Sequence, residues 1–149
     1  MHPWGIHTFE DEIARDWIED LNDSDPVVFL AHCLELGDTN DLNYLACVGV
    51  LCTAELIHAS YAPQSRPYPD AVKLWMTEHQ DLDFKSLTLR AIAALRQILN
   101  PHSDFGLRSE LLERWMDHEK LGTEWLEDKQ NLLRLLEDDF SHSTFGNTS

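Results

Sequence analysis

The sequence holds few of the residues and motifs on which common active sites are built. Only six of its 149 residues are glycine, which leaves little room for a phosphate-binding loop, and it contains neither the G-x-S-x-G nucleophile motif nor EF-hand spacing. The metal-binding motif H-E-x-x-H is also absent, and the eight histidines form no ligand cluster along the chain. These absences favour a protein that is not an enzyme, and the sequence predicts no cofactor.

Cysteine is scarce as well. Cys33, Cys47 and Cys52 lie in apolar, helix-like segments and have no C-x-x-C spacing. An odd number of cysteines in such segments is typical of reduced thiols that pack as small apolar side chains. We therefore expect free, buried cysteines with neither a disulfide framework nor a catalytic or metal-binding role.

The sequence also shows no long apolar run, and we expect no secretory leader. The longest apolar stretch, Tyr44 to Ala54, has eleven residues, whereas a helix that spans a bilayer needs about 20. The opening Met1-His2-Pro3-Trp4 shows no basic region followed by an apolar one, as a secretory signal would. We expect a soluble, cytoplasmic protein whose apolar residues, 43% of the total, form one core.

Basic side chains are outnumbered, most strongly in the first third of the chain. The sequence has 27 Asp and Glu against 11 Lys and Arg, which gives a formal net charge of −16. Residues 1–50 carry eleven of the acids and a single base, Arg15. Such a surface repels phosphate backbones and anionic lipids, so we expect neither nucleic acid nor a membrane as a partner. It favours a basic protein partner, although the same charge would also keep a small protein soluble.

Helical periodicity accounts for most of the chain. Phe9, Ile13, Trp17 and Leu21 recur every four residues and predict a first amphipathic helix. Further stripes follow, punctuated by Gly and Pro, and the sequence shows no alternating strand pattern and no internal repeat. It therefore predicts an all-α, single-domain bundle of six or seven helices over residues 1–140. The polar, glycine-containing segment 141–149 predicts a disordered tail.

One predicted helix is expected to form the centre of the bundle. It covers about residues 39–60, with Asp38 or the next residue as its cap, and is apolar on nearly every side between Leu45 and Ile57. A helix of this kind is buried by neighbours all round. Gly49 in its middle costs about 1 kcal/mol relative to alanine, and we expect a close helix crossing there.

The opening of the chain resembles that of a known bacterial family. Members of domain-of-unknown-function family 4259 begin with the pattern W-G-x-x-x-F-x-x-D-x-A-x-D-W, which this chain matches at Trp4-Gly5, Phe9, Ala14 and Asp16-Trp17. It departs from the family at His2-Pro3, which replaces Gly-Thr, and at residues 10–12, where Glu-Asp-Glu replaces Asp-Asn-Asp.

The resemblance continues over nearly the full chain. Residues 51–57, an apolar stretch with one glutamate, are similar to the central helix of the family. Residues 109–115, followed by Trp125, are similar to its C-terminal pattern S-E-L-x-x-x-W with a second tryptophan. The resemblance identifies relatives but implies no known activity.

Several residues are predicted to anchor the N-terminal segment to the core. An indole followed at once by glycine needs a packing slot and free backbone torsions, so we expect Trp4 and Gly5 to act as anchors, together with Phe9, Trp17 and Glu55. Glu55 lies in the most apolar helix, where an ionised carboxylate needs partners. We expect it to accept hydrogen bonds from the backbone or indole of the Trp4-Gly5 segment. A solvent-facing position at the helix end is the alternative.

A metal or catalytic role for Glu55 is a further alternative, and it depends on His58. The spacing Glu55-x-x-His58 puts a carboxylate and an imidazole on one helix face, as in carboxylate-bridged di-metal bundles. Such sites need a second E-x-x-H and two further carboxylates, and the sequence has no second copy. Glu55 and His58 are therefore only weak candidates for a metal site.

An acidic patch edged by Trp17 is the candidate partner-binding surface. Its predicted members are Asp11, Asp16, Glu19 and Asp20. Aromatic anchors rimmed by acids suit the recognition of a basic partner. The alternative is that Trp17 belongs to the core and that the acids are only solvated. Our first hypothesis is a non-enzymatic helical protein that binds a protein partner, in the manner of an immunity protein or inhibitor whose acidic surface fills a basic cleft.

Two other hypotheses remain open from the sequence. One is a small-molecule- or metal-binding helical domain, or an enzyme, centred on Glu55 and His58. The other is a plain scaffold or oligomerisation module, which would expose an apolar face on the last helix around Trp125 and Leu133. The three hypotheses differ in which residues must be exposed, and the fold therefore bears on all of them.

Overall fold

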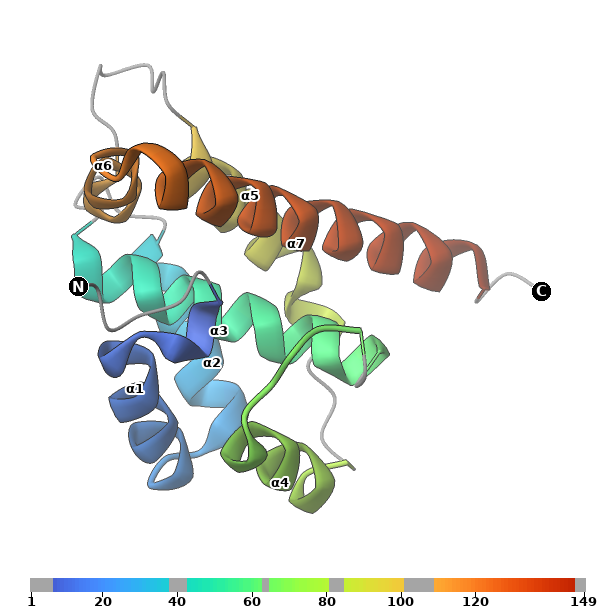
Figure 1. Ribbon diagram of the computed structural model, residues 1–149. Helices are drawn as coiled ribbons and strands as arrows, with labels where there is room; N and C mark the ends of the chain where they lie inside the picture. The colour runs from blue at the N-terminus through green and yellow to red at the C-terminus, as the bar shows by residue number, and fades with distance from the viewer. Residues whose placement is uncertain (1–6, 38–42, 63–64, 81–84, 101–108, 147–149) are drawn as a thin grey trace.

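The computed structural model describes residues 7–37, 43–62, 65–80, 85–100 and 109–146. These residues form seven α-helices and two 3-10 turns and contain no strand, which confirms the prediction of an all-α bundle with six or seven helices. The elements, drawn in Figure 1, are η1 (Thr8–Glu10), α1 (Glu12–Asn22), α2 (Pro26–Gly37), α3 (Tyr44–Tyr61), α4 (Asp70–Glu78), η2 (Lys85–Leu87), α5 (Thr88–Leu99), α6 (Glu110–Met116) and α7 (Glu119–Gly146).

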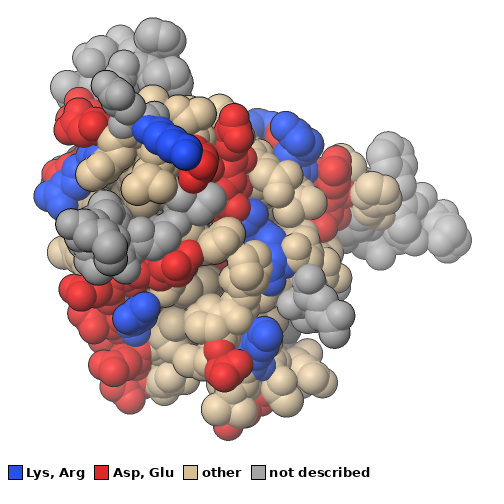
Figure 2. Space-filling model, viewed as in Figure 1, with Lys and Arg blue, Asp and Glu red and all other residues tan. Residues whose placement is uncertain are grey.

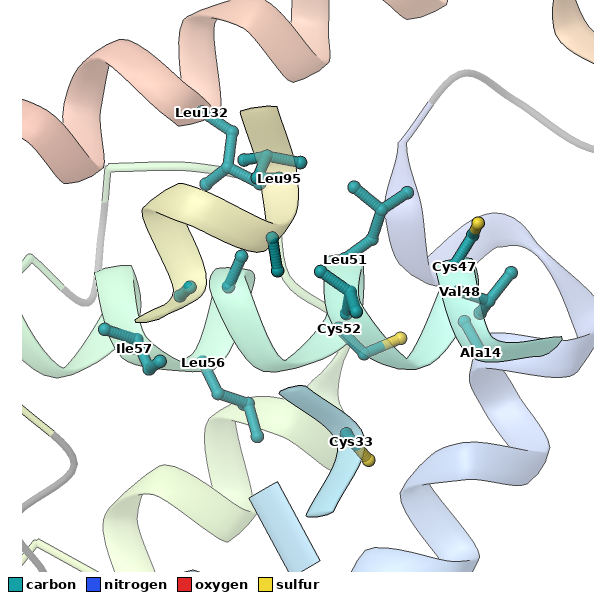
Figure 3. Packing of buried hydrophobic residues seen from close by; sticks show 14 of the residues in the cluster. Ala14, Cys33, Cys47, Val48, Leu51, Cys52, Leu56, Ile57, Leu95 and Leu132 are labelled. Carbon is teal, nitrogen blue, oxygen red and sulfur yellow. The ribbon is translucent and has the colours of Figure 1, made fainter. Parts of the chain in front are cut away.

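Helix α3 is the centre of the fold, as predicted. Every residue from Ala46 to Ala59 is buried, because α1, α2, α5 and α7 all pack against this helix. Figure 1 shows α7 along one side of α3, with α1 and α4 on the other side. Figure 3 shows Leu95 of α5, Leu132 of α7 and Cys33 of α2 gathered around it. The core is therefore built around one helix that has no solvent-facing side along most of its length.

The central helix begins later than residue 39. Asn43 caps it, because its side-chain oxygen accepts a hydrogen bond from the backbone N–H of Ala46 at 2.9 Å. Asp38, the expected cap, lies with residues 39–42 outside the described part of the chain. Asparagine and aspartate are equally good N-caps, so the sequence pattern alone did not distinguish the two starting points.

Helix α3 also has the length and composition of a membrane-spanning helix. Its mean hydropathy is 1.3 over 18 residues, because the helix continues past the eleven-residue apolar stretch to Tyr61. However, 83% of it is buried inside the protein, which is the position of a core helix. The three cysteines are buried thiols that form no disulfide, as the sequence predicts.

The last helix extends beyond the predicted end of the domain. Helix α7 continues to Gly146, so residues 141–146 are helical rather than a disordered tail, while residues 147–149 lie outside the described ranges. Polar side chains do not stop a helix, and this segment has no proline and a glycine only at its final residue. Trp125 is 2% exposed and Leu133 packs against the core, so the exposed apolar stripe expected of a scaffold is not found there.

Two helical glycines differ in how closely other atoms approach them. A Cβ at Gly49 would lie 3.7 Å from Cys33 Sγ and from Trp17 Nε1, an ordinary contact distance, so the expectation of a close crossing at Gly49 is wrong. A Cβ at Gly122 would lie only 2.2 Å from the backbone oxygen of Trp115. Helix α7 can therefore begin against the end of α6 only because residue 122 is glycine.

Candidate functional site

A groove with a volume of about 800 Å³ opens between α1, α2 and α3. The apolar residues along it include Ile13, Trp17, Phe29, Cys33, Ala46 and Val48. Trp17 is 7% exposed, its indole N–H donates a hydrogen bond to Cys33 Sγ at 3.4 Å, and its ring centre lies 5.4 Å from that of Phe29. These contacts hold the indole in one orientation, which gives the groove a fixed apolar floor.

Two exposed carboxylates line this groove from α1. Asp16 and Asp20 are one helical turn apart and therefore lie on the same side of the helix. Leu45, in the first turn of α3, also lines the groove and is 66% exposed. Figure 2 shows acidic side chains gathered over the region where α1 lies in Figure 1. The groove thus combines an apolar floor with an acidic edge.

The other two predicted partner-binding acids lie in different environments. Glu19 is exposed and lines a second hollow of about 580 Å³ between α1 and the segment that precedes α4. Asp11 caps α1 by accepting a backbone hydrogen bond at 2.8 Å, and it also accepts the hydroxyl hydrogen of Tyr44. Burial and the Asp11 carboxylate raise the pKa of Tyr44 well above its usual range. Of the four acids, only Asp16 and Asp20 share the groove.

The predicted N-terminal anchors are described in part. Trp4 and Gly5 fall outside the described residues. Phe9 is 6% exposed and meets a tyrosine ring edge-on, with the two ring centres 6.3 Å apart. The hydroxyl of its neighbour Thr8 donates a hydrogen bond to Glu55 at 2.6 Å. The described part of the N-terminal segment is therefore held to the core by aromatic as well as polar contacts.

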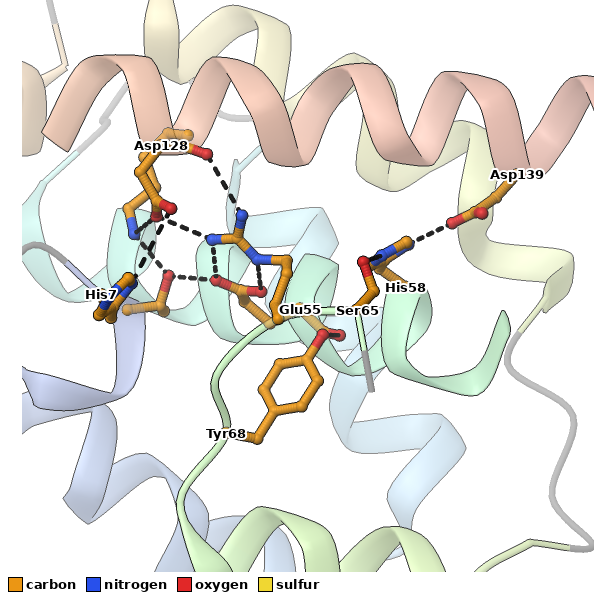
Figure 4. A network of polar contacts seen from close by, with 10 residues as sticks. His7, Glu55, His58, Ser65, Tyr68, Asp128 and Asp139 are labelled. Atoms are coloured by element: carbon orange, nitrogen blue, oxygen red, sulfur yellow. Dashed lines mark hydrogen bonds and ion pairs between the residues drawn. The ribbon is translucent and has the colours of Figure 1, made fainter. Parts of the chain in front are cut away.

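Glu55 is buried at 2% exposure within a network of charged side chains, drawn in Figure 4. Its Oε1 accepts a hydrogen bond from Arg66 Nε at 2.6 Å, and its Oε2 accepts one from Arg66 Nη2 at 2.9 Å in addition to that from Thr8. Arg66 Nη2 also donates to Asp128 Oδ2 at 2.8 Å. Both oxygens of Glu55 are therefore occupied by protein donors.

Lys129 completes the network from α7. Its side chain is 0% exposed, and Nζ donates to Asp128 Oδ2 at 2.8 Å and to Thr8 Oγ1 at 2.9 Å. Burial lowers the pKa of Lys129, although the carboxylates of Glu55 and Asp128 act in the opposite direction. Burial alone would raise the pKa of Asp128, but the charges of Lys129 and Arg66 bring it below its usual 3.8. Two acids and two bases thus compensate one another inside the protein.

His58 makes a separate set of contacts, also drawn in Figure 4. It is 2% exposed, its Nδ1 lies 2.5 Å from Asp139 Oδ2, and its Nε2 lies 2.8 Å from Ser65 Oγ. Glu55 and His58 are therefore both buried but bind different partners. Within the described ranges, no group of three or more His, Cys, Asp or Glu side chains is arranged to hold a metal ion.

Comparison with known proteins shows the family to which the chain belongs. The family model described as Domain of unknown function (DUF4259) matches residues 3–128 of the chain. The chain belongs to the DUF4259 family. This confirms the resemblance identified in the sequence. No curated protein and no solved structure matches the chain. The matched range contains the whole groove of this DUF4259 protein, whereas Lys129 and Asp139 lie beyond it.

Sequence reasoning missed the charged partners of Glu55 in this DUF4259 protein. Arg66 lies in a segment whose prolines indicate only a loop, so nothing near it signals a buried cation. Lys129 did leave a signal, because it stands with Trp125 and Leu132 at spacings of four and three residues on the apolar stripe of α7. A lysine at such a position either extends its amine to solvent or must find a buried partner.

Proposed function

We propose that this DUF4259 protein binds a basic, amphipathic segment of a protein partner in the groove between α1, α2 and α3. The observation that carries the proposal is the apolar floor at Trp17 combined with the exposed carboxylates of Asp16 and Asp20 on the same groove. A volume of about 800 Å³ has room for large apolar side chains. A helix that presents such side chains beside Lys or Arg would dock as amphipathic helices do in apolar grooves.

Charge favours a basic partner over other classes of ligand. The groove is lined entirely by residues 13–49, and residues 1–50 carry eleven acids and one base. A surface of one sign raises the rate at which an oppositely charged partner associates, and added salt reduces that rate. In this proposal the protein blocks its partner by covering the partner's basic surface. Such a role is that of an immunity protein or an inhibitor.

Two double charge reversals on α1 test the proposal. Asp16→Lys with Asp20→Lys alters the groove edge, whereas Glu19→Lys with Asp23→Lys makes the same charge change at exposed positions that do not line the groove. Each protein is isolated from its own cells and examined by native mass spectrometry at low and moderate salt. We expect a stoichiometric second protein on the wild type and the control, and about 100-fold weaker binding to the groove variant, since like charges at an interface cost about 3 kcal/mol or more.

The control pair separates a specific site from a general charge effect. Equal loss of the second protein from both variants would mean that net charge, rather than the groove, drives association. Retention by the groove variant, or a bare protein in every sample, would contradict the proposal. Circular dichroism of each variant checks that the helical content is unchanged, because all four substituted side chains are exposed.

A further inference from the structure

The contacts of His58 have the order found in a Ser–His–Asp triad. Ser65 Oγ lies 2.8 Å from His58 Nε2, and Asp139 Oδ2 lies 2.5 Å from His58 Nδ1. Catalytic triads use the two ring nitrogens in this way, with the nucleophile at Nε2 and the carboxylate at Nδ1. The three residues come from the segment after α3, from α3 and from α7, so the fold assembles them from distant parts of the chain.

The carboxylate sets the direction of both hydrogen bonds. An ionised carboxylate can only accept, so the Nδ1 of His58 carries the proton that it donates to Asp139. In the neutral imidazole Nε2 then has a free lone pair, and the hydroxyl of Ser65 donates to it. A serine whose hydroxyl donates to an oriented imidazole is arranged to become a nucleophile.

The three residues differ in their exposure to solvent. A nucleophile has to be accessible to its substrate, whereas the base and the carboxylate behind it do not. Ser65 is exposed, whereas His58 is 2% exposed and the Asp139 side chain 15% exposed. The bond between His58 and Asp139 would by itself tie α3 to α7. The second bond does something more, because it connects this buried pair to a serine that is an exposed residue.

We propose that Ser65 is a nucleophile for carboxylic esters, with His58 as its general base and Asp139 as the positioning residue. Ser65 Oγ forms a bond to the acyl carbon while its proton passes to Nε2, and the ester C–O bond breaks as the alcohol leaves with that proton. Water then attacks the acyl-serine and gives a proton to Nε2. The serine oxygen leaves with this proton, which releases the carboxylic acid and restores Ser65.

The surrounding charges favour neutral or cationic esters as substrates. Arg66 is next to Ser65, but its side chain is 4% exposed and its charge is matched by Glu55 and Asp128. It is therefore not free to bind an anionic acyl group. Residues 137–139 of α7 are all acidic, and the chain as a whole has a net charge of −16, so an anionic ester would be repelled.

An alkyl fluorophosphonate probe tests the nucleophile, because it labels an activated serine with loss of fluoride. The labelled residue is identified by peptide mass spectrometry, and hydrolysis of p-nitrophenyl acetate is followed in parallel. Ser65→Ala removes the nucleophile, and Asp139→Asn keeps the side-chain shape but removes the charge that stabilises the protonated imidazole. Ser60→Ala and Asp138→Asn are matched controls, because Ser60 donates to its own helix and Asp138 is exposed.

The proposal gives one expected pattern. The probe labels Ser65 in the wild type, Ser65→Ala abolishes that label, and Asp139→Asn slows labelling by about 10²-fold, the lower end of what a positioned base contributes. Both controls keep the wild-type rate, and ¹⁵N NMR of His58 shows less of the Nδ1–H tautomer in Asp139→Asn. Absence of label at Ser65, or an unchanged rate in Asp139→Asn, overturns the proposal. Thermal unfolding of each variant confirms that labelling is read on folded protein, so a stability loss alone cannot mimic the result.

Discussion

Replacing Glu55 with glutamine keeps the shape of the side chain but removes one of the two negative charges in the buried network. Arg66 and Lys129 would then share only the carboxylate of Asp128, at a site where the side chains of Glu55 and Arg66 are 3% and 4% exposed. Removing one partner of a buried ion pair costs about 3–5 kcal/mol, a large part of the roughly 5–15 kcal/mol that stabilises a domain. We therefore expect Glu55→Gln to lower the free energy of unfolding by about 3 kcal/mol or more at neutral pH.

Because of Lys129, the decrease in the free energy of unfolding caused by Glu55→Gln is expected to depend on pH. Burial already lowers its pKa in the wild type, and Glu55 is the largest influence that raises it, so the variant lowers that pKa further. A lysine whose folded-state pKa lies below its unfolded value of 10.5 binds fewer protons when folded, and stability then rises with pH from the folded pKa towards 10.5. The stability gap between Glu55→Gln and the wild type is therefore expected to shrink as the pH rises above neutral.

Urea unfolding, followed by tryptophan fluorescence and far-UV circular dichroism, measures these free energies. Arg66→Met and the double variant complete a thermodynamic cycle. Because Glu55 and Arg66 compensate one another, the double variant is expected to lose less than the sum of the two single losses, by about 1–3 kcal/mol. Single losses below about 1 kcal/mol, or additive losses, would refute the reasoning that the network is mutually compensated.

Two further predictions concern packing and burial. Gly122→Ala is expected to lower the free energy of unfolding by about 2 kcal/mol or more, because its Cβ would lie 2.2 Å from a backbone oxygen. Gly49→Ala is expected to raise it by up to about 1 kcal/mol, and equal urea midpoints for the two variants would contradict both expectations. Burial raises the pKa of Cys47 from 9.0 to about 11, so the folded state keeps a proton that the unfolded state loses. The free energy of unfolding is therefore expected to fall as the pH rises through this range. Urea titrations at several pH values measure this dependence, and the same decrease with pH in Cys47→Ala as in the wild type would count against this cause.

The helices could be predicted because their signals are local, whereas the site residues depend on packing. The four-residue spacing of hydrophobic residues up to Leu21 is enough to identify α1, and the same spacing put Asp16 and Asp20 on one side of it. Phe9, the first residue of that predicted stripe, lies instead in η1, because Asp11 is extended and caps α1. The partners of Glu55 and His58 carry no such signal. Thr8 lies 47 residues from Glu55, and Asp139 lies 81 residues from His58, so these pairs depend on the order in which the helices pack.

The hydrogen bond between Lys129 and Thr8 joins residues that are 121 positions apart, and this separation constrains how the protein is made. At about 5–20 residues per second, ribosomes add the 74 residues from Glu55 to Lys129 in roughly 4–15 s. During that interval α3 has been made but lacks the helix that supplies Asp128 and Lys129 and packs against it. The buried network around Glu55 therefore cannot be completed while the first half of the chain is synthesised. The network can close only when α7 is available, and bringing Lys129 back to Thr8 then carries the entropic cost of closing a loop of about 120 residues.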